Sequence, residues 1–179
     1  DDVGIVIINE NWSNFDMSEL KIKNKSKPKC KITDNRYIKP NFLINIDRNN
    51  ISSTMIECMD KMLHFSQLYI RNIMNENFKI EDLKDNKYKI SAEYILGNRD
   101  RSKFPFIYEQ MKSISDLKIK CIDKNYNLGI VNVFKNLEYI AGEDVFEYTL
   151  SNDINISLYN GNNIIGEPES NPYFSDMSY

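Results

Sequence analysis

Positive charge is missing from the C-terminal part of this 179-residue chain, where no Lys or Arg follows Lys135. Residues 136–179 contain eight Asp and Glu residues, so the net charge of −3 leaves +5 on residues 1–135. Charge segregated in this way creates a directional electric field that steers the approach of charged partners. The distribution favours a binding protein and does not by itself define a chemical reaction.

Cysteine and histidine are both scarce. The three cysteines, Cys30, Cys58 and Cys121, are an odd number and lie far apart, which favours a reducing compartment over a secreted disulfide framework. His64 is the only histidine, and we interpret it as a surface or structurally satisfied side chain. On a helix it would point away from Cys58, so the two cannot form a catalytic pair. No Cys/His pair has the spacing of metal ligands, so the sequence predicts no metal site.

Glycine and long apolar runs are also sparse. The six glycines form neither a phosphate-binding loop nor a dinucleotide-binding fingerprint. Carboxylate pairs such as Glu143 and Asp144 are too common in proteins to indicate acid–base catalysis. No apolar run approaches the ~20 residues of a membrane span. We therefore predict a protein that is not an enzyme, binds no cofactor and does not enter a membrane.

Short apolar segments separated by polar turns occupy most of the chain. We predict strands at residues 3–8, 41–47, 68–73, 87–95, 117–122, 128–134, 145–150 and 154–159. Apolar and polar residues alternate cleanly at 87–95 and 154–159, which is typical of antiparallel strands with one solvated face. Asn160-Gly161 suits a tight hairpin turn after the last of them. Many short strands with frequent turns favour a mainly β fold, either a sandwich or a barrel.

One helix is predicted at residues 53–65. Thr54 and Glu57 have the spacing of a capping box. Apolar residues then recur at helical intervals: Met55, Cys58, Met59 and Met62. We interpret this stripe as core packing rather than as a recognition groove.

A second helix is predicted around Pro105, which suits a first helical turn. Ile107, Met111 and Ile114 would lie on one face of that helix. We treat residues 1–166 as a single domain, since no boundary or repeat interrupts them. Residues 167–179 form an irregular acidic tail that contains Tyr and Pro.

A lysine stands at every second position from Lys21 to Lys31. On an extended strand all six would share one face, because strand side chains alternate. Such a face suits phosphates or an acidic protein surface. It equally suits an edge strand that lysines and Pro28 protect from aggregation, and we favour this second interpretation. Nucleic acid ranks lower as a partner, because the net charge is acidic and Tyr37 is the main aromatic residue nearby.

Eight stretches of the chain carry a resemblance in their order and spacing. They are GIVIIN at 4–9, ELKIK at 19–23, KCKITDNRY at 29–37, FLINI at 42–46, LYIRN at 68–72, KYKISAEYI at 87–95, LKIKCIDKN at 117–125 and the stretch 128–139. Together they resemble the chordopoxvirus host-range family over roughly residues 4–139. The acidic tail with Tyr and Pro is also similar.

The resemblance implies an antiparallel β-sandwich wrapped by two short helices. It also implies a non-enzymatic protein of the host cell cytoplasm that antagonises interferon-induced restriction. Several members of the family bind the host's large sterile-alpha-motif-domain antiviral protein. Where the vaccinia member has a Trp-containing loop, this chain has Arg48-Asn49-Asn50-Ile51, and its sole Trp is Trp12. This departure concerns the partner rather than the fold.

The resemblance leads us to expect partner binding at loops on one end of the sandwich. The residues predicted to bind are Lys25, Lys27, Lys29, Arg36, Tyr37, Arg99, Asp100 and Arg101. The expected partner is a host antiviral protein, bound by a monomer. One alternative is a secreted β-sandwich that captures an extracellular ligand, which glycosylation at Asn24 or Asn155 would favour. The other is a nucleic-acid-binding module that uses the Lys21–Lys31 ladder and loses affinity steeply with salt.

Overall fold

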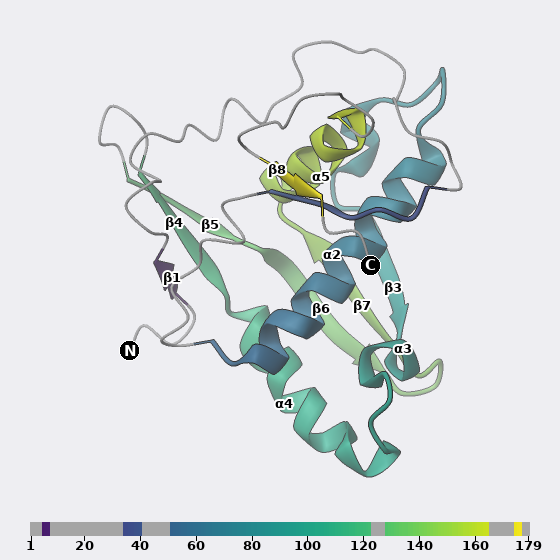
Figure 1. The fold of residues 1–179 in the computed structure, drawn as a ribbon, viewed down its shortest axis with the longest axis vertical. Helices are drawn as coiled ribbons and strands as arrows, with labels where there is room; N and C mark the ends of the chain where they lie inside the picture. Colours follow the sequence, from purple (N-terminus) through teal and green to yellow (C-terminus); the bar gives the residue numbers. More distant parts are fainter. Residues whose placement is uncertain (1–4, 8–33, 41–50, 123–127, 165–173, 177–179) are drawn as a thin grey trace.

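The computed structural model describes residues 5–7, 34–40, 51–122, 128–164 and 174–176. These residues form a mixed α/β fold (Figure 1), so the prediction of a mainly β sandwich is wrong. Four α-helices lie within them: α2 (Ser53–Ile73), α3 (Ala92–Leu96), α4 (Phe104–Ser115) and α5 (Asn152–Ile164). Short 3₁₀ helices occur at η4 (Ile80–Leu83) and η5 (Arg101–Lys103).

The strands form three small sheets. In the first, β3 (Lys87–Ser91), β7 (Val145–Leu150) and β6 (Phe134–Ile140) are antiparallel in the order β3-β7-β6. In the second, β4 (Lys118–Ile122) pairs antiparallel with β5 (Leu128–Asn132) and parallel with β1 (Ile5–Ile7). In the third, β2 (Ile38–Pro40) pairs antiparallel with β8 (Phe174–Asp176). Figure 1 shows the β4–β5 pair extending away from the helices as a long arm.

Helix α2 is longer than its sequence pattern predicts. It begins after Ser52, whose hydroxyl accepts a hydrogen bond from Met55 N at 3.0 Å, rather than at Thr54. It continues to Ile73, so the strand predicted at 68–73 is wrong. The buried stripe includes polar side chains in this second half, such as Gln67 and Arg71. Because these buried residues are polar, the apolar residues alone do not repeat at helical intervals in this half of α2.

Helix α5 replaces the strand and the hairpin turn that were predicted at 154–161, and both of these predictions are wrong. Its apolar and polar residues are buried alike, because other elements surround the helix on most sides. Asn155, for example, is fully buried and accepts a hydrogen bond from Tyr88 Oη at 2.7 Å. The alternation of apolar and polar residues at 154–159 therefore does not indicate a solvated strand face. Gly161 lies within the helix, where its backbone passes close to Ile38.

Other predictions are confirmed in part. The strand predicted at 87–95 exists only as β3, and Ser91 then caps α3 by accepting from Tyr94 N at 3.1 Å. Helix α4 forms as predicted, with Ile107, Met111 and Ile114 buried. The strands predicted at 3–8, 117–122, 128–134 and 145–150 contain β1, β4, β5 and β7, whereas β6 was not predicted. The strand predicted at 41–47 and the lysine ladder lie outside the described residues.

One hydrophobic core joins these elements. Two buried tyrosines on neighbouring strands, Tyr88 of β3 and Tyr148 of β7, stack with their ring centroids 5.2 Å apart. Phe104 docks α4 onto β6, since its ring lies 4.8 Å from that of Tyr139. Helix α2 packs against α4, α5 and β3. Within the described part of the chain, none of the helices has the length and apolar character needed to cross a membrane.

Candidate nucleic-acid interface

Two consecutive helices, α3 of five residues and α4 of twelve, are separated by seven residues, 97–103, which include η5. Helix α3 ends at Gly97, whose positive φ of 64° is a backbone conformation that favours glycine. Residues 98–100 complete the turn, and η5 leads directly into α4. The β4–β5 pair follows α4 along the chain and runs away from it (Figure 1). The connection from α3 to α4 is longer than the 3–4-residue turn of helix-turn-helix proteins.

An ion pair fixes the turn to the neighbouring hairpin. Arg101 donates to both carboxylate oxygens of Asp144, at 2.6 and 3.0 Å, and Tyr139 Oη donates to the same carboxylate at 2.6 Å. These hydrogen bonds, that of Arg101 foremost, lower the pKa of Asp144. Asp144 lies in the β6–β7 turn at a φ of 53°, a conformation that Asp tolerates better than most residues. The entry to α4 is therefore held against the β6–β7 hairpin.

The other residues predicted in this loop also make contacts within the protein. Arg99 forms an ion pair with Glu57 of α2 at 2.6 Å. The Asp100 carboxylate accepts from Ser102 N at 2.8 Å and thereby caps η5. Arg99, Asp100 and Arg101 thus lie together on one loop, as predicted, but each of them already stabilises the turn before α4.

Helix α4 has one buried and one exposed face. Ile107, Met111 and Ile114 point into the core. On the exposed side, Phe106 is 48% exposed and Tyr108 is 39% exposed. This face was missed in the sequence analysis, although Phe106 is an apolar residue outside the buried stripe. That mismatch was the available signal.

Positive charge surrounds this face. Lys103 precedes α4 and Lys118 begins β4, and both are exposed and without an ion pair among the described residues. Lys112 lies on α4 itself, 3.9 Å from Glu109. Residues 92–132 contain seven basic and five acidic residues, whereas the whole chain has a net charge of −3. The segment from α3 to β5 therefore carries a net charge of +2.

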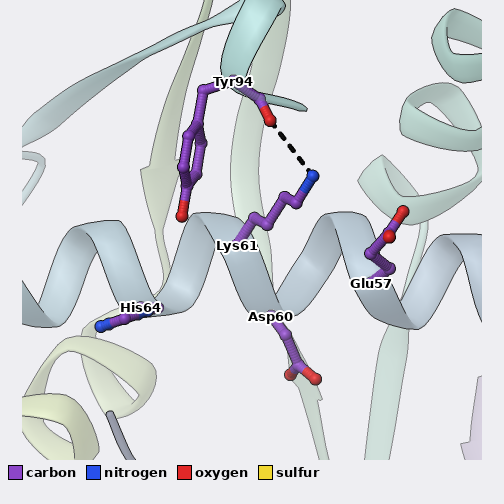
Figure 2. A pocket seen from close by; sticks show the side chains of 5 residues that line it. All are labelled: Glu57, Asp60, Lys61, His64 and Tyr94. Atoms are coloured by element: carbon purple, nitrogen blue, oxygen red, sulfur yellow. Dashed lines mark hydrogen bonds between the residues drawn. The ribbon is translucent and has the colours of Figure 1, made fainter. Parts of the chain in front are cut away.

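A pocket of about 410 Å³ lies beside the same turn (Figure 2). It is lined by side chains of α2 and by one residue of α3: Glu57, Asp60, Lys61, His64 and Tyr94. Lys61 Nζ donates to the carbonyl oxygens of Tyr94 and Ile95, at 3.1 and 3.2 Å. His64 bonds through Nε2 to Asn35 O at 2.8 Å, and burial lowers its pKa.

The acidic residues of this pocket are also paired, Glu57 with Arg99 and Asp60 with Lys39 at 2.7 Å. The charged side chains of this pocket therefore stabilise the fold through contacts within the protein. Across the described residues, no three His, Cys, Asp or Glu side chains gather as metal ligands.

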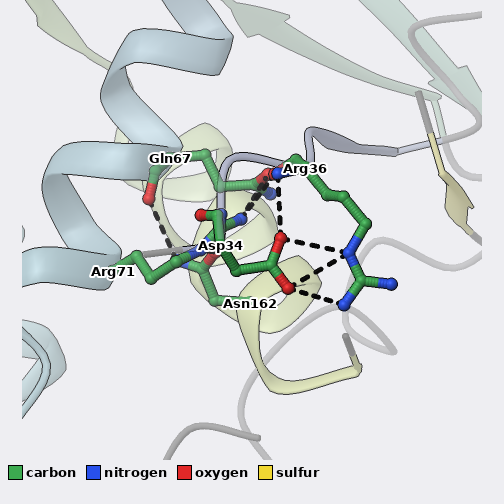
Figure 3. Close-up of polar contacts among 5 residues, drawn as sticks. All are labelled: Asp34, Arg36, Gln67, Arg71 and Asn162. Carbon is green, nitrogen blue, oxygen red and sulfur yellow. Dashed lines mark hydrogen bonds and ion pairs between the residues drawn. The ribbon is translucent and has the colours of Figure 1, made fainter. Parts of the chain in front are cut away.

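The remaining predicted binding residues divide into two groups. Arg36 pairs with the Asp34 carboxylate at 2.6 Å (Figure 3), which holds the pKa of Asp34 at about 2. Tyr37 is fully buried and stacks on His64, with ring centroids 5.3 Å apart, so it presents no surface to a partner. The second group, Lys25, Lys27 and Lys29, lies outside the described residues.

Comparison with known proteins identifies no relative, because the chain matches no protein-family profile, no curated protein and no solved structure.

Proposed function

We propose that this chain is a non-catalytic protein that binds double-stranded DNA through the exposed face of α4. The observation that carries the proposal is the exposed face of α4, where Phe106 and Tyr108 are exposed near Lys103 and Lys112. An exposed helix of this kind would bind duplex DNA in the major groove. The major groove of B-DNA is about 12 Å wide and admits an α-helix, whereas that of A-form RNA is too narrow for side-chain readout.

The charges around α4 support the same partner. Three exposed lysines lie along α4. Lys103 precedes the helix, Lys112 lies on it, and Lys118 follows its end. Lysines so placed can contact the phosphates on either side of a groove while the helix occupies it. Such contacts provide the sequence-independent part of the affinity.

The rigid mounting of α4 supports it further. Arg101 and Arg99 tie the turn to the β6–β7 hairpin and to α2, respectively. Helix α4 also packs on β6 through Phe104. Base edges can be read only when the helix keeps one orientation in the groove, which is the orientation that phosphate contacts fix.

Nucleic-acid binding was the alternative prediction from the lysine ladder, and we now assign it to α4. Binding to a host antiviral protein in the cytoplasm stays a prediction from the resemblance. The β-sandwich that the resemblance implied is wrong for the described residues, so it gives that prediction no support. Affinity capture from interferon-treated cells tests it separately.

The test of DNA binding is a salt series on a labelled duplex of mixed sequence, measured by fluorescence anisotropy. Replacing Lys103, Lys112 and Lys118 by Gln removes three phosphate contacts. The slope of log affinity against log salt should then become shallower by about 2.7.

The control replaces Lys87, Lys89 and Lys135 by Gln, which changes the net charge equally on β3 and β6, where these lysines pair with acidic residues. It should leave the slope nearly unchanged. Equal effects of both triple variants, or no binding to duplex DNA at low salt, would refute the proposal.

A further inference from the structure

The two edges of the short strand β2 are occupied in different ways. On the edge that faces α2, the side-chain amide of Gln67 bonds to both backbone groups of Ile38, accepting from its N–H at 2.8 Å and donating to its carbonyl oxygen at 2.9 Å. The opposite edge pairs antiparallel with β8, the last strand of the chain (Figure 1). One edge of β2 is therefore held by a side chain of a helix, and the other by a strand.

The register of this pair shows how little backbone joins β8 to β2. The opposed residues are Ile38 and Asp176, Lys39 and Ser175, and Pro40 and Phe174. Opposed residues of an antiparallel pair alternate between hydrogen-bonded and non-hydrogen-bonded positions. Because the backbone groups of Ile38 are bonded to Gln67 and Pro40 has no N–H, both of these residues occupy non-hydrogen-bonded positions. Lys39 and Ser175 therefore form the one hydrogen-bonded pair between Ile38–Pro40 and β8.

Strand β2 is anchored to the helices independently of β8. The Lys39 side chain is almost fully buried and pairs with Asp60 of α2 at 2.7 Å. Arg71, also of α2, donates to the carbonyl oxygens of Asp34 and Arg36, which lead into β2. A two-stranded pair is marginal in water unless it packs on other elements, and here β2 supplies that packing through α2 and α5. Strand β2 is thus a preformed docking edge, and β8 is the strand that can leave it.

The occupant that fits this edge is the strand seen on it. A second copy of the chain carries the same strand and the same edge, and exchange of an identical element between copies is a low-cost route to self-association. The tether of β8 to α5 through residues 165–173 opposes exchange. A strand on a short tether competes at an effective concentration on the order of 1 mM.

We propose that β2 is a strand-docking site that accepts the C-terminal strand of a second copy in place of its own β8. Exchange joins two chains where their local concentration approaches that of the tethered strand. The proposal does not depend on DNA binding by α4.

The test measures binding of a peptide with the sequence of residues 167–179 to the full-length chain, followed by the nuclear magnetic resonance signal of the Lys39 amide. Ser175→Pro removes the N–H of the hydrogen-bonded pair, so the chain releases its own β8. This variant should bind the peptide with a dissociation constant below about 1 mM, because β8 forms in the closed chain at an effective concentration of that order. The wild type, whose own strand competes, should need more than about 1 mM peptide for half-saturation.

Asp176→Pro is the matched control, because Asp176 occupies a non-hydrogen-bonded position and its N–H is not used in the pair. This variant should bind the peptide as weakly as the wild type does. A peptide that itself carries Ser175→Pro should bind none of the three chains. Absence of binding to the Ser175→Pro chain at several mM peptide, or equal binding by all three chains, would overturn the proposal.

Discussion

At the scale of single residues, the side-chain amide of Gln67 satisfies both backbone polar groups of Ile38 in β2. Its side chain accepts from Ile38 N at 2.8 Å and donates to Ile38 O at 2.9 Å and to Leu158 O at 3.1 Å (Figure 3 shows its place beside Arg71 and Asn162). All three groups are buried, where unpaired polar atoms are costly.

Replacing Gln67 by Leu should therefore lower the free energy of unfolding by about 3 kcal/mol, since each orphaned buried group costs about 1–3 kcal/mol. Urea denaturation monitored by circular dichroism measures this change. Gln110→Leu is the control. Among the described residues Gln110 has one side-chain hydrogen bond, accepted from Ser52 Oγ and exposed, so this replacement should change the free energy of unfolding by less than about 1 kcal/mol. Equal losses in the two variants would contradict the role given to Gln67.

Asp34 should make stability depend on acid pH. Its pKa is lowered from 3.8 to about 2, chiefly by the hydrogen bond from Arg36. A lowered pKa in the folded state contributes stability that is complete above the unfolded value and is lost as pH falls from about 4 to about 2.

The contribution is at most about 2 kcal/mol. Urea midpoints measured between pH 5 and pH 2 should converge for the wild type and Asp34→Asn as the pH falls. Asp116→Asn, which removes an exposed carboxylate without an ion pair in the described part, should parallel the wild type. A constant difference between wild type and Asp34→Asn would contradict the prediction.

Cys58 should be chemically silent in the folded protein. The thiol is fully buried, and burial raises its pKa to about 11. Only the thiolate reacts with alkylating reagents. Peptide mass spectrometry after treatment with iodoacetamide at pH 8 should find Cys58 unmodified until urea unfolds the protein, and rapid labelling in buffer would contradict its burial.

At the scale of elements, the contact of α5 with β2 depends on a glycine. A Cβ atom at Gly161 would lie 2.6 Å from Gln67 Nε2 and 3.0 Å from Ile38 O. The Gln67 amide cannot move freely, because its hydrogen bonds hold it.

Gly161→Ala should therefore destabilise the protein by about 1–3 kcal/mol, despite the better helix propensity of Ala. Gly142→Ala provides the comparison, because a Cβ there meets nothing within 4 Å. It should change the free energy of unfolding by less than about 0.5 kcal/mol. Thermal denaturation of both variants decides the matter, and a stabilised Gly161→Ala would contradict the packing described.

The elements also show what the sequence could predict. Helix α4 was predictable because its inward face is wholly apolar and Pro105 marks its first turn. Helix α5 was not, since Asn155 is buried through tertiary hydrogen bonds with Tyr88 and Leu83, and Ser157 is buried with its hydroxyl donating to Asp153 O in the same helix. A pattern method treats such residues as solvated.

The candidate interface was only partly predictable for the same reason. The loop from Arg99 to Arg101 was identified from its charges, but its ion pairs join residues far apart in sequence, 43 positions in the case of Arg101 and Asp144. Only the fold shows that these charges position α4. The sequence places Phe106 outside the apolar stripe of α4, but only the fold shows that its side chain is exposed.

At the scale of the whole molecule, one core includes residues from each of the four α-helices and from β3, β4, β6 and β7. The single domain predicted for residues 1–166 stays a prediction, which unfolding can test. Far-ultraviolet circular dichroism and tyrosine fluorescence should report one coincident transition. Two separated transitions would show that part of the chain folds independently.

The burial of α5 also has a consequence for synthesis on the ribosome. Gln67 and Arg71 of α2 find their partners Leu158 and Asn162 in α5. About 90 residues are translated between the end of α2 at Ile73 and the end of α5 at Ile164. At about 5–20 residues per second, this interval lasts roughly 5–20 s. During that time the nascent chain holds an incomplete core, so native folding awaits the emergence of α5.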